Sequence, residues 1–419
     1  MRVHYAWVVL VTATIVVFGA LGLARFGYAA VLPEMQQGLG LDNSQAGVLA
    51  TANLFGYLLL AVFGGALAAK FGPRVVISVG MGVVGLGMLL TGAAQTFVAA
   101  GLFRALTGVG SGASNVPVMA LLPAWFGPRR RGLAAGIGVA GSSVAMIVVG
   151  PVVPRILAGF GESGWRVTWG VFGLTALGIA VLAAVLLRNS PGAMGLAPLG
   201  GDGQMAAANV PTSKKAGLQW GRVYRSWVVW QAGLVYMAFG FSYIIYMTFF
   251  KKYLIAEAGC SQASAGNLFM LTGWFSLGCG LIWGGVSDRI GRRAALIMVY
   301  MVQAAAFGLF AVKGSMAAIT ASAILFGLTA WSIPAIMAAL CGDLLGPRLA
   351  PAGLGFVTLF FGIGQALGPS VAGMIADRTG SFAPAFVLAM AIALLGAGSS
   401  ALLRPHRPEA LVPSGEQVQ

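Results

Sequence analysis

The sequence predicts an all-α polytopic membrane protein with twelve transmembrane helices, built as two six-helix bundles related by a pseudo-two-fold repeat. Composition is the first observation behind this prediction. Of the 419 residues, 58% are hydrophobic and only 8% are charged, whereas a soluble domain carries about 25% charged residues. The second is a series of apolar runs that reach the roughly 20 residues needed for a spanning helix. The third is an internal repeat. A water-soluble or disordered chain is excluded.

The apolar runs are separated by short breaks that contain glycine, proline or arginine, which end helices. The first run follows Arg2 and continues to about Leu32, too long for the apolar core of a signal peptide. It ends at Pro33-Glu34, and later breaks include Gly346-Pro347-Arg348. The spans expected in the first half are 6–32, 44–69, 74–93, 97–124, 132–158 and 167–188. Those expected in the second half are 227–250, 262–286, 294–312, 316–345, 351–375 and 381–403.

The domain organisation follows from a polar stretch between the two sets of spans. We expect a first bundle, a flexible cytosolic loop, a second bundle and a cytosolic tail, over 1–188, 189–222, 223–403 and 404–419. The net charge is +15. Of the 25 Lys and Arg residues, 17 fall on the side of the N-terminus, six on the other side and two within spans. This asymmetry predicts a multi-pass protein of the bacterial inner membrane with both termini in the cytosol.

The two halves repeat one another at an offset of 217 to 220 residues. Trp7-Val8-Val9 matches Trp227-Val228-Val229, and Gly72-Pro73-Arg74 matches Gly291-Arg292-Arg293. A parallel repeat of six helices is a known transporter design, with the substrate near the midplane between the halves.

Two motifs add a family resemblance to this pattern. The loop after the eighth span reads Gly284-Gly285-Val286-Ser287-Asp288-Arg289-Ile290-Gly291-Arg292-Arg293, and the fourth span contains Arg104-Ala105-Leu106-Thr107-Gly108-Val109-Gly110. With the repeat, these residues resemble the major facilitator superfamily over essentially the whole chain. In the first half the loop motif is degraded, with Ala69 in place of the aspartate. The resemblance implies conformational gating at these turns, for which we name Lys70, Arg74, Asp288, Arg289, Arg293 and Asp343. Asp343 is expected to pair with Arg289 or Arg348.

Finer resemblances point to small organic anions. The stretch from Leu23 to Tyr28 looks like a bacterial branch with an arginine in helix 1. Gly164-Trp165-Arg166 is shared with monocarboxylate and oxalate:formate exchangers. The basic residues that those exchangers carry in helices 8 and 11 are absent from this chain.

Two arginines within spans are the main candidates for substrate binding, because a charge within a span is costly unless it faces protein or water. Arg25 offers a planar fork to a carboxylate, and the alternative is that it packs against a neighbouring helix or extends to the membrane surface. For Arg104, helix packing is the stronger alternative. We expect the first half to hold the anionic end of the substrate and the second half to supply a wall.

The remaining candidates are aromatic or polar residues of the spans, with packing and interhelical hydrogen bonding as the alternatives. Tyr236, Tyr243 and Tyr246 fit one helix face. The other candidates are Tyr28, Asn53, Tyr57, Asn115, Ser142, Ser143, Asn267, Trp274, Trp331, Ser332 and Gln365.

We expect a secondary transporter that moves a small organic anion, with a monocarboxylate favoured, by alternating access. Proton symport and anion exchange are both left open, and efflux of hydrophobic compounds is the alternative. An enzyme is disfavoured because the two histidines lie near the termini, the three cysteines lack metal-ligand spacing, and no nucleotide-binding loop is found. No cofactor, metal or nucleic-acid partner is expected. The expected partners are the substrate, membrane lipids and, in a symporter, protons, with the protein a monomer.

Overall fold

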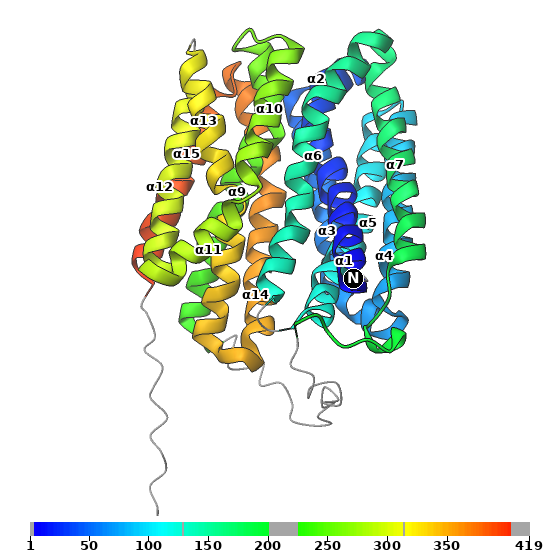
Figure 1. The fold of residues 1–419 in the computed structure, drawn as a ribbon. Helices are drawn as coiled ribbons and strands as arrows, with labels where there is room; N and C mark the ends of the chain where they lie inside the picture. The colour runs from blue at the N-terminus through cyan, green and yellow to red at the C-terminus, as the bar shows by residue number, and fades with distance from the viewer. Residues whose placement is uncertain (1–3, 128–129, 201–224, 313–314, 404–419) are drawn as a thin grey trace, which may run out of the picture.

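The computed structural model describes residues 4–127, 130–200, 225–312 and 315–403. Over these residues the fold is helical, with one isolated backbone bridge between Phe126 and Leu199 in place of any sheet. Figure 1 shows two groups of roughly parallel helices standing side by side, one from each half of the chain. We call the end of the molecule that carries Asn189 and Arg292 the inner end, and the opposite end, with Asn43 and Asp377, the outer end.

The first bundle begins with one long, irregular span and continues with five regular ones. The first span is composed of α1 (Tyr5–Val17), the π-helix η1 (Phe18–Phe26) and α2 (Gly27–Leu39). The others are α3 (Asn43–Phe71), α4 (Pro73–Ala93), α5 (Phe97–Trp125), α6 (Arg131–Phe160) and α7 (Gly164–Leu186). The short 3-10 helices η2 (Gly161–Ser163) and η3 (Gly192–Met194) follow α6 and α7.

The second bundle contains two spans that are interrupted near the middle. Its helices are α9 (Trp227–Ala256), α10 (Gln262–Ser276), α11 (Cys279–Ile290), α12 (Arg292–Ala311), α13 (Met316–Thr329), α14 (Ser332–Thr379) and α15 (Ala383–Ala401). Between α10 and α11 the axis bends by 41°. Ala330 and Trp331 separate α13 from α14.

Ten helical stretches of the described chain are long and apolar enough to cross a membrane, and the bent pair α10 and α11 adds an eleventh. One of the ten, Arg131–Leu186, contains both α6 and α7. The arrangement therefore agrees with twelve crossings in two bundles, as the sequence predicts.

Local signals explain where the helices begin and end. Asp42 and Gln45 form a reciprocal capping box that starts α3. Gly72 and Gly291 have φ angles of +86° and +89°, in a region that glycine adopts readily, and each forms the turn between two helices. Because these two glycines are equivalent in the repeat, the same turn occurs in both bundles.

Two expected boundaries differ in the structure. The first span does not end near Pro33, because the helix continues through it to Leu39. A proline removes only one backbone hydrogen bond, and the helix tolerates this loss when its neighbours hold it. The seventh span extends to Ala256 rather than to residue 250, so Lys251 lies within the helix.

The expected break between the tenth and eleventh spans lies inside α14. Leu345 ends one apolar stretch and Ala352 begins the next. The chain reverses direction between them, because the side chains of Cys341 and Leu345 face Gly353, and residues eight apart in a straight helix would be about 12 Å apart.

Part of the expected flexible loop is ordered. Asn189 accepts a hydrogen bond from the backbone of Arg74, and Leu199 exchanges backbone hydrogen bonds with Trp125 and Gly127. Residues 189–200 therefore belong to the inner end of the first bundle. The remaining residues of the expected loop, 201–222, and the tail 404–419 lie outside the described chain.

Candidate functional site

Arg25 lies at the end of the irregular part of the first span. Over Phe18–Phe26 the helix is widened, and the N–H of Gly27 donates to the carbonyl of Gly22, five residues earlier. Gly22 permits this path because a β-carbon there would overlap the side chain of Ala145 on α6. π-helical turns within α-helices occur frequently at functional sites. Here the turn sets the direction of the Arg25 side chain at the boundary between the bundles.

Arg104 holds the backbone next to Arg25 from inside the first bundle. Its guanidinium is 1% exposed and donates from Nη1 to the carbonyl of Ala24 at 2.7 Å. Its Cζ lies 4.5 Å from the ring centroid of Tyr28 and 5.2 Å from that of Trp169. Arg104 therefore acts on the position of Arg25 through the backbone, which favours the packing role over direct substrate contact.

Arg104→Ala is expected to destabilise the first bundle, because the Ala24 carbonyl loses its donor and a cavity opens between two rings. We expect a loss of about 2–4 kcal/mol in the free energy of unfolding. The apparent melting temperature of the purified protein without ligand measures this effect. Arg155→Ala, at an exposed arginine of α6, is the matched control. A melting temperature equal to wild type would contradict the role assigned to Arg104.

Four residues from four helices surround Arg25. Its Nη1 donates to Tyr243 Oη at 3.4 Å, and its Cζ lies 4.8 Å from the ring centroid of Tyr57. Gln365 Nε2 also donates to Tyr243 Oη, and Asn115 Nδ2 donates to Tyr57 Oη at 3.0 Å. We call these five residues the Arg25 cluster. Because Tyr57 and Asn115 belong to the first bundle and Tyr243 and Gln365 to the second, the cluster bridges the two bundles.

Two nitrogen atoms of the Arg25 guanidinium are available as hydrogen-bond donors. Its Nε and Nη2 atoms are buried and have no hydrogen-bond partner among the residues that the structure describes. The ion pairs found along the described chain belong to Arg292, so no carboxylate of that part of the protein neutralises Arg25. A buried cation without a counter-ion is energetically costly. The cluster is thus electrostatically suited to receive an anion.

A stack of aromatic rings extends from the cluster into the second bundle. The rings of Phe239 and Tyr243 are 4.7 Å apart, and those of Tyr236 and Phe361 are 4.5 Å apart, all nearly parallel. Trp331 packs against Phe26 at a ring distance of 5.4 Å. The rings form an apolar surface beside the cluster, and a role for this surface as a wall of the substrate site stays a prediction.

A chain of hydrogen bonds crosses between the bundles beside Trp331. Trp331 Nε1 donates to Ser143 Oγ at 3.0 Å, and Ser276 Oγ donates to the same oxygen at 2.8 Å. Ser143 is one of the polar candidates expected from the sequence, whereas Ser276 was not expected at the site. The adjacent Ser142 was selected, and it donates instead to the carbonyl of Val139 in its own helix.

The other predicted site residues lie elsewhere. Tyr246 is buried in the core of the second bundle, where it contacts Phe310 and Phe326 and shares a hydrogen bond with Ser322. Three more predicted residues lie in the protein interior. Tyr28 Oη donates to the carbonyl of Ala46, Asn53 Nδ2 donates to the carbonyl of Arg104, and Ser332 is fully buried. Asn267 and Trp274 are exposed on α10.

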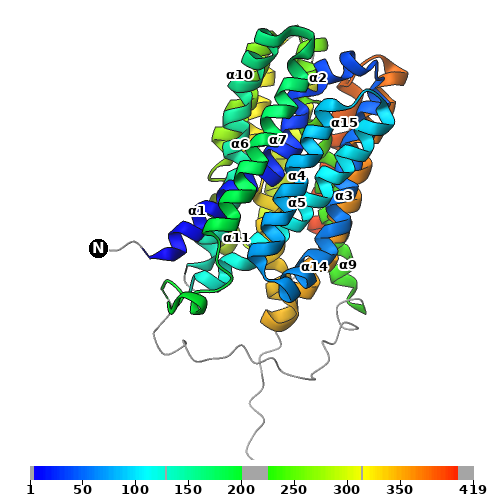
Figure 2. The same cartoon turned by 90° about the vertical axis from the view of Figure 1, so that its right-hand side faces the viewer.

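The outer end is closed by hydrogen bonds between the bundles. The Asp377 carboxylate of α14 accepts from the backbone N–H groups of Asn43 and Ser44 at 3.0 and 2.7 Å, and from Ser44 Oγ. It thereby caps α3, which belongs to the other bundle. Thr51 Oγ1 donates to the carbonyl of Ala366 at 2.6 Å. In Figure 2, α3 and α14 lie beside one another, as these contacts require.

A second set of contacts at the outer end involves Lys251 and Glu34, two charged residues that we expected outside the spans. Lys251 is 1% exposed, and its Nζ donates to the carbonyl of Ala30 at 2.7 Å. Gln262 Nε2 donates to Glu34 Oε1. Sequence reasoning missed these residues because it ended both helices too early.

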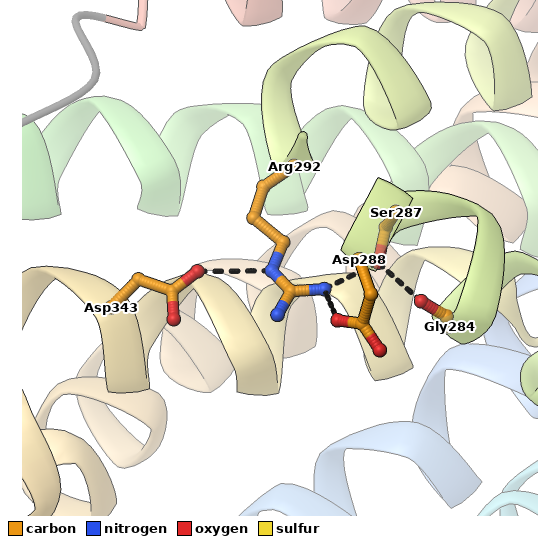
Figure 3. Close-up of polar contacts among 5 residues, drawn as sticks. All are labelled: Gly284, Ser287, Asp288, Arg292 and Asp343. Carbon is orange, nitrogen blue, oxygen red and sulfur yellow. Dashed lines mark hydrogen bonds and ion pairs between the residues drawn. The ribbon is translucent and has the colours of Figure 1, made fainter. Parts of the chain in front are cut away.

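The inner end of the second bundle is held by Arg292 (Figure 3). Its Nε donates to Asp343 at 2.9 Å and its Nη1 to Asp288. Asp343 therefore pairs with Arg292, whereas we expected Arg289 or Arg348. The spacing of four residues between Asp288 and Arg292 was the signal in the sequence. Both aspartates are more than half exposed, so each pair alone contributes little stability.

The remaining predicted gating residues do not join this triad. Arg289 and Arg293 are exposed. In the first bundle, Arg74 Nε donates to the carbonyl of Ala184 at 2.7 Å, and Lys70 lies over the ring of Phe71. Gating by these residues stays a prediction.

Comparison with known proteins identifies the family to which this chain belongs. The sequence profile of the Major Facilitator Superfamily matches residues 14–312 and again 234–419. A probable sulfoacetate transporter of Cupriavidus necator is 28% identical over 91% of this chain and 90% of its own length. The hexuronate transporter of Bacillus subtilis is 25% identical over 95% and 94%. A crystal structure of a bacterial homologue of the human lysosomal transporter Spinster has a TM-score of 0.73 at 16% identity, covering 96% of this chain and 98% of that one. The chain therefore belongs to the Major Facilitator Superfamily of multi-pass membrane transport proteins.

Proposed function

We propose that the protein moves a small organic anion across the bacterial inner membrane by alternating access, with Arg25 as the charge partner of the substrate carboxylate. One observation carries the proposal. In the described part of the chain, the Nε and Nη2 atoms of Arg25 are buried without a hydrogen-bond partner and no carboxylate neutralises the guanidinium. These two atoms form one edge of the guanidinium, and such an edge binds both oxygens of a carboxylate side by side.

The relatives support an anionic substrate. The names of two of them specify sulfoacetate and hexuronate, which are both organic anions. We infer that this chain carries a compact carboxylate, with monocarboxylates first among the candidates. Proton symport and anion exchange are both compatible with this charge partner, because in either mode the substrate neutralises the arginine in each loaded crossing.

The position of the cluster supports alternating access. The hydrogen bond from Arg25 to Tyr243 joins the bundles near the middle of the molecule, whereas the contacts of Asp377 and Lys251 close the outer end. An anion bound at Arg25 lies between the bundles. A relative movement of the bundles exposes this position first to one side of the membrane and then to the other. Orientation with both termini in the cytosol follows from the distribution of lysine and arginine.

A ligand screen on the purified full-length protein tests the substrate class. A ligand that binds the folded state raises the apparent melting temperature, by an amount equivalent to about 2.7 kcal/mol at 100 times its Kd. We expect small carboxylates to stabilise the protein, and neutral sugars and hydrophobic cations to leave it unchanged. Stabilisation by hydrophobic cations alone would overturn the proposal in favour of efflux of hydrophobic compounds.

A further inference from the structure

We propose that Asn115 and Tyr57 form a second polar subsite that binds a hydroxyl group of the substrate, so that the protein selects hydroxylated carboxylates over plain ones. This inference rests on the proposed function, because it assigns the part of the substrate that extends beyond the carboxylate at Arg25.

The first observation is an unpartnered atom on Asn115. The residue is 9% exposed, and its Nδ2 donates to Tyr57 Oη at 3.0 Å, but its Oδ1 is buried without a hydrogen-bond partner among the described residues. Buried amide oxygens in folded proteins nearly always accept a hydrogen bond. If the amide were rotated by half a turn, Oδ1 would accept from Tyr57 and Nδ2 would remain without a partner. In either orientation the amide presents one polar atom that a ligand can satisfy.

The second observation is the bonding state of Tyr57. Its Oη accepts the hydrogen bond from Asn115, so the phenolic proton is available for a further acceptor. Together the two side chains offer a donor from Tyr57 and an acceptor from Asn115. An alcohol hydroxyl accepts one hydrogen bond and donates another, so it complements this pair. A methylene group in the same place would leave both polar atoms unpaired.

The third observation links the subsite to Arg25. The Arg25 guanidinium lies over the ring of Tyr57, with Cζ 4.8 Å from the centroid, and Asn115 bonds the hydroxyl of the same ring. The side chain of Tyr57 therefore separates the Arg25 guanidinium, which binds the carboxylate, from the Asn115 amide. A carboxylate and a hydroxyl that are a few bonds apart in one small molecule can reach both groups together.

Asn115 comes from the same bundle as Tyr57, so a simple packing bond between α3 and α5 would also place the two side chains together. Packing alone gives no reason for a ligand hydroxyl to matter. The two explanations therefore differ in the relative affinities for matched ligands, which makes ligand selectivity the deciding measurement.

The experiment compares three matched pairs of ligands on the full-length protein in detergent: lactate with propionate, malate with succinate, and gluconate with hexanoate. Melting temperature is followed against ligand concentration to obtain each Kd. For wild type we expect at least one hydroxylated member to bind about tenfold or more tightly than its plain partner, because a site built to bond a hydroxyl rejects the analogue that lacks it. In Asn115→Leu the preference is expected to fall to about twofold or less, while the affinity for the plain carboxylate is retained.

The possible results separate this inference from the proposed function. If no carboxylate of any pair binds, the proposed function fails and this inference fails with it. If carboxylates bind but wild type does not distinguish the members of the pairs, only the hydroxyl subsite is overturned. The same holds if Asn115→Leu weakens both members equally. Tyr57→Phe, which keeps the ring under Arg25 and removes the hydroxyl, serves as the second variant if Asn115→Leu does not fold. It is expected to reduce the preference in the same direction.

Discussion

Replacing Arg25 with alanine is expected to weaken binding of the carboxylate substrate by about 100-fold or more and to abolish measurable transport. The substitution removes two charge-assisted hydrogen bonds from the Nε and Nη2 edge, whose atoms have no other partner among the described residues. Hydrogen bonds to charged groups contribute about 1.5–3 kcal/mol, and a tenfold change in Kd corresponds to about 1.4 kcal/mol. Isothermal binding measurements on the purified variant, with the carboxylate found for wild type, give the ratio directly.

Two further variants determine why Arg25 matters. Arg25→Lys keeps the positive charge but loses the planar fork, so we expect an affinity between those of wild type and Arg25→Ala. Arg155→Ala removes an exposed arginine and is expected to bind substrate as wild type does. If Arg25→Ala binds the carboxylate with unchanged affinity and melts at a lower temperature, Arg25 is a packing residue and the anion site lies elsewhere.

The sequence was sufficient to predict the fold because the membrane imposes simple requirements. The length of each apolar run determines a span, and the turns at Gly72 and Gly291 mark the repeat. Helix ends near charged residues were harder to predict. Pro33 and Lys251 were expected to lie at or beyond helix ends, but both lie within helices. The Lys251 ammonium is satisfied by the Ala30 carbonyl of the other bundle, and contacts between bundles are not visible in a single sequence.

For the candidate site, too, some features could be predicted from the sequence and others could not. Sequence position gives the depth of a residue in the membrane, so Arg25 and Arg104 were both placed at a suitable depth. It does not give the direction of a side chain. The π-helical turn before Arg25 and the bond from Arg104 to the Ala24 carbonyl determine that direction. The bond from Asp377 to α3 could not be predicted, because it joins residues more than 330 positions apart.

Gly266→Val is expected to prevent closure of the outer end and to stop transport without unfolding the protein. A β-carbon on Gly266 would overlap the carbonyl oxygen of Gly150 on the other bundle, and one on Gly150 would lie 2.5 Å from the Gly266 oxygen. Overpacking of this kind costs about 1–3 kcal/mol or more, and backbone atoms cannot move aside as a flexible side chain can. Because Gly150 and Gly266 belong to different bundles, the overlap destabilises the closed outer end and leaves the stability of each separate bundle unchanged.

Cysteine labelling measures this change. Ser44 is partly buried and bonds to Asp377 across the closed outer end. We expect Ser44→Cys to react more slowly with a membrane-impermeant maleimide added outside while this end is closed than when it opens. The protein's own Cys260, Cys279 and Cys341 are buried, which keeps the background low. Adding Gly266→Val is expected to raise the labelling rate at least tenfold, since a shift of 1.4 kcal/mol changes the population ratio tenfold.

A valine at Gly178 of α7 controls for the added side chain, because nothing lies within 4 Å of a β-carbon there. Gly178→Val is expected to keep both transport and slow labelling, and a melting temperature near that of wild type in both variants shows that the bundles remain folded. Slow labelling with intact transport in Gly266→Val would mean that the outer end closes without this close approach. Fast labelling with lost transport would show that contact between α6 and α10 is a requirement of the closed state, since the substitution adds bulk and no charge.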